Sequence, residues 1–271
     1  MLYHLHDIRH ALLTPARMAA EMAQNFYRHP MNPLSYTHDG RTLAAQAELF
    51  ERMTTRFEKP VFNLPHTEIS DKKTTVNEET IIEKPFCNLL HFKRDTKRKD
   101  PKALIVSPMS GHFATLLRGT VKALLPHHDI YMTDWHDARL VPLTDGRFNL
   151  DDYIAYLIEF IRKIGPDVHV IAVCQPAVPV YAAVALMVLW NDEKCPQSMT
   201  LMGGPIDTRV SKTQVTELAE NRSLDWFEKS VTMHVPLYYP GGGRKVYPGF
   251  IQLGGFMSMN LDRHVGSSIK F

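Results

Sequence analysis

One cysteine follows directly on an apolar, β-branched run in VHVIAVCQPAVPV, residues 168–180. The run predicts a buried strand and the residues after Pro176 predict a buried helix, so Cys174 would lie on the turn between them. A thiol on such a turn is exposed above a parallel sheet, and the N-terminus of the helix favours the thiolate. Cys174 is therefore a candidate nucleophile for attack on an acyl carbon, with a buried structural thiol as the alternative.

The residues around Cys174 match the usual nucleophile pattern G-x-S-x-G only loosely. Cysteine replaces serine, Ala172 replaces the first glycine and Pro176 replaces the second. Proline is compatible with the first turn of a helix, where N–H groups have no intrahelical partner. The motif alone is weak evidence, so the interpretation depends on other segments.

A second candidate element is the loop SPMSGH, residues 107–112, which follows another apolar run. In a hydrolase with such a sheet, this loop supplies one backbone N–H of an oxyanion hole, and the residue after the nucleophile supplies the other. We predict these roles for the backbone N–H groups of Ser110 and Gln175. An ordinary turn is the alternative that the loop by itself leaves open.

These residues would be positioned by strands and helices that alternate along the middle of the chain. Short apolar runs separated by helical segments predict an α/β fold with a parallel sheet covered on both faces, and reactive groups at the C-terminal ends of its strands. The expected strands are residues 103–107, 129–133, 168–173 and 198–202, and the expected helices are residues 115–125, 150–164 and 177–190.

The remaining segments have different patterns. Helical spacing predicts helices at 7–27 and 42–55, alternation predicts an antiparallel strand pair at 79–83 and 86–92, and the basic stretch 93–102 predicts a solvated linker. We expect N-terminal helices and the strand pair in residues 1–95, the α/β core with its nucleophile in 96–207, and the start of a cap or lid in 208–271.

Composition and charge exclude several classes of protein. The 31 Lys and Arg residues nearly balance 29 Asp and Glu, which disfavours nucleic acid as a partner. The apolar run 168–190 has Gln175, Pro176 and Pro179 near its middle, so we expect no membrane span. Three cysteines without metal-ligand spacing predict neither a metal site nor disulfides, and no cofactor is expected. With no secretion signal at the N-terminus, we expect a cytoplasmic protein.

Beyond these motifs, the sequence resembles the intracellular poly(3-hydroxybutyrate) depolymerases. The likeness is carried by long strings: MLYHLHDIRHALLTPAR, SPMSGHFATLLRGTV, YMTDWHDARLVPL, VHVIAVCQPAVPV, LMGGPIDTRV and YPGFIQLGGFMSMNLDRH. The resemblance implies an α/β-hydrolase fold and a carboxylic ester hydrolase with Cys174 as nucleophile. It would degrade the stored polyester through an acyl-enzyme to 3-hydroxybutyrate oligomers or monomer. It also implies association with storage granules, and it leaves the oligomeric state open.

The resemblance has one gap. The family carries a catalytic Asp and then a His further along the chain, no position here matches them, and the closing VGSSIKF differs from the family. We therefore expect a C-terminally truncated chain without the final core strands. Asp207 and His234 have the required order, but nothing in the sequence places His234 beside the thiol. Without a substitute base, the chain would be an inactive fragment.

Two other functions stay open. A polyhydroxyalkanoate-synthase-like acyltransferase would share the cysteine turn, but it would accept a hydroxyacyl group from a coenzyme A thioester. A non-catalytic granule-binding protein would use apolar residues near the C-terminus, although core or cap packing is a simpler role for them. These residues are Phe250, Phe256, Met257 and Met259.

Overall fold

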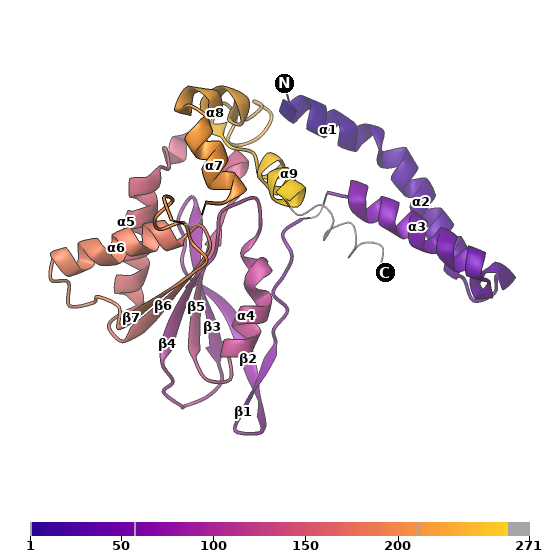
Figure 1. Cartoon of the computed structure of the whole chain (residues 1–271). Helices are drawn as coiled ribbons and strands as arrows, with labels where there is room; N and C mark the ends of the chain where they lie inside the picture. The colour runs from indigo at the N-terminus through magenta and orange to yellow at the C-terminus, as the bar shows by residue number, and fades with distance from the viewer. Residues whose placement is uncertain (1, 57, 211, 260–271) are drawn as a thin grey trace. The chain divides into compact units, whose positions relative to one another are not determined.

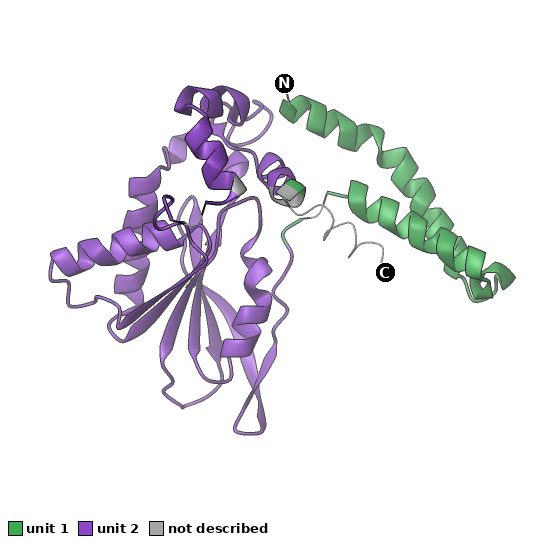
Figure 2. Ribbon diagram, viewed as in Figure 1, with its two compact units in different colours: residues 1–59, 256–271 green, residues 60–255 purple. Residues whose placement is uncertain are grey.

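A computed structural model describes residues 2–56, 58–210 and 212–259 of the chain. They fall into two compact units, residues 1–59 with 256–271 and residues 60–255 (Figure 2). All residues predicted for the site belong to the unit formed by 60–255. The VGSSIKF segment lies outside the described residues, as do the side chains of Phe256, Met257 and Met259.

The N-terminal unit is helical. It contains α1 (Leu2–Leu12), α2 (Thr14–Arg28), the short 3₁₀ turn η1 (Pro33–Tyr36) and α3 (His38–Thr54). The helix predicted at 7–27 is thus two helices, because Pro15 cannot donate the hydrogen bond that a continuous helix would direct to Ala11. Arg17 on α2 donates to the carbonyl of Thr54 at the end of α3 (2.7 Å), which ties the two helices together.

The larger unit contains a mixed sheet of seven strands in the order β1-β2-β3-β5-β4-β6-β7 (Figure 1). Strands β5, β4, β6 and β7 run parallel, and β1, β2 and β3 extend the sheet in antiparallel fashion beyond β5. The four predicted parallel strands and the predicted antiparallel pair are confirmed. The strands are β1 (His66–Ile69), β2 (Lys72–Ile82), β3 (Cys87–Arg94), β4 (Lys102–Val106), β5 (Asp129–Trp135), β6 (Val168–Val173) and β7 (Ser198–Met202).

Helices cover both faces of this sheet, as the continuous apolar strands require. Figure 1 shows α5 (Leu150–Ile164) and α6 (Ala177–Leu189) on one face, and α4 (Arg118–Leu124) on the other. Side chains alternate between the two cores along β3: Leu89 packs toward α5 and α6, whereas Leu90 and Phe92 pack toward α4. The short turn η2 (Ala114–Leu117) leads into α4.

The bounds predicted for α5 agree with the structure because both of its ends are encoded locally. Asn149 accepts a hydrogen bond from the N–H of Asp152, and the Asp152 carboxylate accepts one from the N–H of Asn149, which completes a capping box. At the other end Gly165 has a φ of 97°, a conformation that terminates the helix without steric cost.

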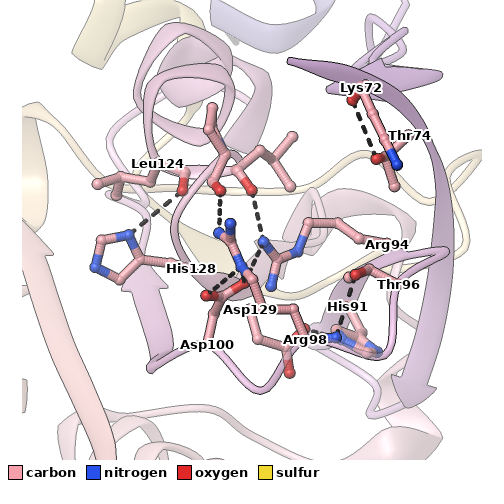
Figure 3. Close-up of polar contacts among 12 residues, drawn as sticks. Lys72, Thr74, His91, Arg94, Thr96, Arg98, Asp100, Leu124, His128 and Asp129 are labelled. Carbon is pink, nitrogen blue, oxygen red and sulfur yellow. Dashed lines mark hydrogen bonds and ion pairs between the residues drawn. The ribbon is translucent and has the colours of Figure 1, made fainter. Parts of the chain in front are cut away.

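Residues 95–101 of the basic stretch form a mostly exposed loop, as expected, but Lys93 and Arg94 belong to β3, and ion pairs with Asp100 fold the loop into a corner (Figure 3). The buried Arg94 donates to the carbonyl of Leu125 (3.0 Å) and pairs with Asp100 (2.8 Å), which also binds Arg98 (2.7 Å). Burial opposes ionisation of Asp100, but hydrogen bonds from Arg98 and Arg94 outweigh it and lower the pKa of this carboxyl. Because β3 pairs with β5 in the same sheet, the two compact units divide at residue 59, not near the predicted boundary at 95.

Neighbouring polar groups fix the start of β5 at the same end of the sheet (Figure 3). Asp129 is held by His91 Nε2 (2.8 Å) and by the Tyr131 hydroxyl (3.1 Å), and the His91 and Tyr131 rings stack 4.4 Å apart. Burial would raise the pKa of Asp129, but these two partners lower it overall. Asp129 and Cys174 are at opposite ends of the parallel strands.

After β7 the chain forms α7 (Gln214–Asn221), α8 (Leu224–Ser230), the small hairpin β8 (Met233–His234) and β9 (Lys245–Val246), and α9 (Gly249–Met259). The buried Arg244 fastens this segment to the loop between β5 and α5, where it donates to the carbonyls of Val141 (3.1 Å), Pro142 (2.7 Å) and Gly146 (2.7 Å). No described helix has both the length and the apolar character that crossing a bilayer requires.

Candidate active site

Cys174 occupies the sharp turn between β6 and α6, where the sequence predicts it. Its φ is +69°, a left-handed conformation that costs a non-glycine residue about 1–3 kcal/mol. Two hydrogen bonds maintain this conformation: the Cys174 N–H donates to the carbonyl of Met202 (2.8 Å), and the Cys174 carbonyl accepts from Ala177 (3.0 Å). The thiol is exposed, so the structure presents it to solvent at the C-terminal end of β6.

The glycine that allows close packing at this turn lies on the neighbouring strand end. A Cβ atom on Gly204 would lie 2.1 Å from the Cβ of Ala177 and 2.8 Å from the carbonyl oxygen of Cys174. Ala172 and Ala177 are fully buried, so both small residues pack tightly around the turn. Gly204 therefore provides room that the usual pattern obtains from a glycine at the position of Pro176. This role of Gly204 was not recognised from the sequence, although the Gly203-Gly204 pair directly after β7 could have indicated it.

The loop 107–112 is anchored to β5 through its first residue. Ser107 donates its hydroxyl to the carbonyl of Thr133 (2.7 Å) and its N–H to the Thr133 hydroxyl (2.9 Å). Trp135 Nε1 donates to the carbonyl of Ser107 (2.9 Å). Because Ser107 is fully buried, these contacts fix the direction in which the loop leaves β4.

The loop reaches the cysteine turn through Met109. Its backbone N–H donates to Oε1 of Gln175, the residue after Cys174, at 3.3 Å. Ser110, predicted as the donor in this loop, is buried one residue further on and makes no hydrogen bond to Gln175 in the described part of the chain. The loop and the turn thus meet at the N–H of Met109, which sequence reasoning did not single out, and the roles of the Ser110 and Gln175 backbone N–H groups stay predictions.

The same loop touches the C-terminal segment backbone to backbone. Gly111 has a φ of +78°, and a Cβ atom there would lie 2.5 Å from the carbonyl oxygen of Gly249, the first residue of α9. A side chain at position 111 would therefore be both conformationally strained and sterically blocked. The position of α9 and the path of the loop are linked at this point.

Within residues 2–56, 58–210 and 212–259, no His, Asp or Glu side chain forms a hydrogen bond with the Cys174 thiol. In the described residues, Cys174 Sγ makes no hydrogen bond. The exposed Asp207 carboxylate binds Arg209 (2.8 and 2.7 Å), and hydrogen bonds from Arg209 lower the pKa of Asp207. His234 is exposed on β8, and no hydrogen bond joins it to Cys174 in the described part of the chain. The described residues contain no group of three His, Cys, Asp or Glu side chains placed to hold a metal ion.

A mixed sheet with parallel central strands, and a sharp strand-to-helix turn after β6 that contacts the loop after the neighbouring β4, is typical of the α/β-hydrolase fold. The fold predicted from the sequence is therefore confirmed, together with its N-terminal helical extension. Residues 203–271 match the family described as "PHB de-polymerase C-terminus", so the match includes the closing VGSSIKF, which was expected to differ from the family. This match confirms the resemblance to poly(3-hydroxybutyrate) depolymerases.

Solved structures similar to the chain are esterases and related proteins. The naproxen esterase (carboxylesterase NP) from Bacillus subtilis is 11% identical with a TM-score of 0.33, covering 46% of this chain and 42% of that chain. A putative esterase from Staphylococcus aureus is 9% identical with a TM-score of 0.35, covering 67% and 58%. Carboxylesterase CesB from Bacillus subtilis is 11% identical with a TM-score of 0.34, covering 62% and 58%. The chain thus spans about half the length of these proteins. No curated protein matches it.

Proposed function

We propose that this chain carries the nucleophile of a carboxylic ester hydrolase that acts on poly(3-hydroxybutyrate). The observation that carries the proposal is the exposed Cys174 thiol on a left-handed turn, next to a residue in contact with the Met109 N–H. The family match over residues 203–271 supports the substrate class. Association with polyester granules in the cytoplasm is part of the same proposal.

The chemistry follows from the two donors beside the thiol. The Cys174 thiol gives its proton to a base in solution, and the thiolate forms a C–S bond to the ester carbonyl carbon while the carbonyl π electrons move onto oxygen. The N–H groups of Gln175 and Met109 would stabilise this oxyanion. Collapse of the adduct restores the carbonyl and breaks the ester C–O bond. The released alkoxide takes a proton from water, and water then hydrolyses the thioester to a carboxylic acid and the free thiol.

The experiment incubates the purified chain with amorphous polyester granules and measures both intact protein mass and released 3-hydroxybutyrate. We expect a covalent hydroxybutyryl adduct on Cys174 that is absent from Cys174→Ala. Cys195→Ala is the matched control, because burial raises the pKa of the Cys195 thiol and thereby disfavours its thiolate. The adduct should form equally in that variant.

Two results would contradict the proposal. One is an unmodified Cys174 together with no released 3-hydroxybutyrate after granule treatment, in a protein whose Cys174 still reacts with iodoacetamide. The other is an adduct formed from 3-hydroxybutyryl coenzyme A but never from polyester, which would identify an acyltransferase instead.

A further inference from the structure

The side chain of Gln175 engages the Met109 N–H, one of the two donors assigned above to the ester oxygen. Its Oε1 accepts from the Met109 N–H at 3.3 Å, longer than the usual 2.9–3.0 Å for an N–H donor. The backbone N–H of Gln175 itself makes no hydrogen bond in the described residues. Of the two donors at the thiol, one is therefore open and the other is engaged by a neutral oxygen of the chain.

We propose that the Gln175 carboxamide is a resting occupant of the oxyanion site, which a substrate ester must displace before Cys174 can be acylated. The inference rests on the proposed function, since only an attack that creates an oxyanion needs the Met109 N–H. The carboxamide oxygen of Gln175 and the carbonyl oxygen of the ester are acceptors of the same kind, and they compete for the Met109 N–H. Until substrate binds, the Gln175 carboxamide oxygen takes the place of water as the acceptor for this donor.

The contact is weak enough to be displaced. Gln175 is exposed, so its side chain can rotate into solvent, where water replaces the lost hydrogen bond. A developing oxyanion forms a charge-assisted bond to Met109, which is roughly twice as strong as the neutral one. The occupant therefore disfavours binding of the neutral ester and gives way as negative charge develops.

The occupant predicts that two reactions of the same thiol respond differently to substitution of Gln175. Acylation by a p-nitrophenyl ester passes through an oxyanion and releases p-nitrophenolate, which needs no proton from the protein. Alkylation by iodoacetamide forms a C–S bond and releases iodide without an oxyanion. The ratio of the two second-order rate constants separates occupancy of the site from general reactivity of the thiol.

The experiment measures this ratio for the full chain and three variants. In Gln175→Ala, and in Gln175→Met, which keeps the side-chain length without the carboxamide oxygen, the ratio should rise about three- to tenfold, the loss of one neutral hydrogen bond. In Gln175→Glu it should fall below that of the unmodified chain, because a carboxylate repels the oxyanion. Gln197→Ala is the matched control: Gln197 is exposed at the start of β7, its side chain contacts Asp167, and its ratio should not change.

The outcomes distinguish this inference from the function on which it depends. An unchanged or lower ratio in both Gln175→Ala and Gln175→Met, with unfolding curves like that of the unmodified chain, would refute the occupant while leaving ester attack intact. Acylation of none of these proteins, with alkylation of Cys174 preserved, would refute the proposed function itself and the occupant with it.

Discussion

Replacing Gly204 by alanine tests whether the neighbouring strand end shapes the nucleophile turn. The added methyl group would lie 2.1 Å from the Cβ of Ala177 and 2.8 Å from the carbonyl oxygen of Cys174. Neither atom belongs to a flexible side chain, so the backbone of the turn has to move. The carbonyl of Cys174 also accepts the Ala177 N–H, and displacement would weaken this bond.

The magnitude follows from this geometry. Overpacking a tight site costs about 1–3 kcal/mol, and contacts on rigid atoms place Gly204→Ala near 3 kcal/mol. Ala177→Gly removes the nearer contact and costs up to about 1 kcal/mol by itself. The double variant should therefore be about 1 kcal/mol more stable than Gly204→Ala, a coupling typical of touching residues. Gly119→Ala on α4, where nothing lies within 4 Å, should stabilise by about 0.5–1 kcal/mol and serves as the control.

The assay is urea unfolding followed by tryptophan fluorescence. The three tryptophans, Trp135, Trp190 and Trp226, all belong to the unit formed by 60–255, so the signal reports that unit alone. Alkylation of Cys174 by iodoacetamide measures the turn directly and should slow in Gly204→Ala. An unchanged unfolding midpoint in Gly204→Ala, or a double variant no more stable than that single one, would refute the packing argument.

The same urea assay tests three further expectations. Arg94→Met removes one of the two arginine partners of the partly buried Asp100 carboxylate and the donor to the Leu125 carbonyl, and should cost about 2 kcal/mol, whereas a loss below about 0.5 kcal/mol would contradict a structural role for Arg94. Folding lowers the pKa of Asp129 below its value in the unfolded chain, which is near 4. The ionised Asp129 carboxylate therefore stabilises the folded state above about pH 4, and this stabilisation is lost as pH falls. Asp129→Asn should therefore lose less stability than the unmodified chain between about pH 5 and about pH 3, and equal losses would exclude this contribution. Tyr153→Phe should leave stability unchanged or raise it by up to about 1 kcal/mol, because the Tyr153 hydroxyl is buried with no partner in the described residues; a clear loss would reveal a hidden hydrogen bond.

The core of the fold could be predicted because its signals are local in sequence. The parallel strands are short β-branched runs, and α5 has a capping residue at one end and Gly165 at the other. The short strand β1 escaped prediction because its four residues, 66–69, are stabilised by pairing with β2 and have no apolar run of their own. Pairing between segments is not encoded in either segment alone.

The start of the basic stretch 93–102 was interpreted from its charged composition, and the strand periodicity that continues into it was given too little weight. Leu90, Phe92 and Arg94 follow one another at every second position of β3 and face the same core. Continuing this alternation places an inward side chain at position 94 despite its charge, although the strand was predicted to end at residue 92. Arg94 is tolerated there because the Leu125 carbonyl and Asp100 satisfy its guanidinium.

The candidate site likewise combines features that the local sequence predicts with features that depend on contacts between distant segments. The position of Cys174 on its turn could be predicted because strand, turn and helix are consecutive in the sequence. The contact between Met109 and Gln175 joins residues 66 positions apart and depends on one side-chain conformation. The importance of Gly204 depends on which strand lies beside β6, a fact of topology that no local pattern contains.

The contact between Gly111 and Gly249 limits how this protein can be recombined with its relatives. A chimaera that exchanges the segment after β7 for that of a related protein can import a new residue opposite Gly111. Any side chain there would place a Cβ 3.2 Å from the Cα of Gly111, closer than ordinary van der Waals contact, so the backbone of the loop would have to shift. Crossover points for such chimaeras should therefore keep the loop 107–112 and the start of α9 from the same parent. The loop 107–112 and the start of α9 therefore have to be exchanged together, although most of the α/β core lies between them in the sequence.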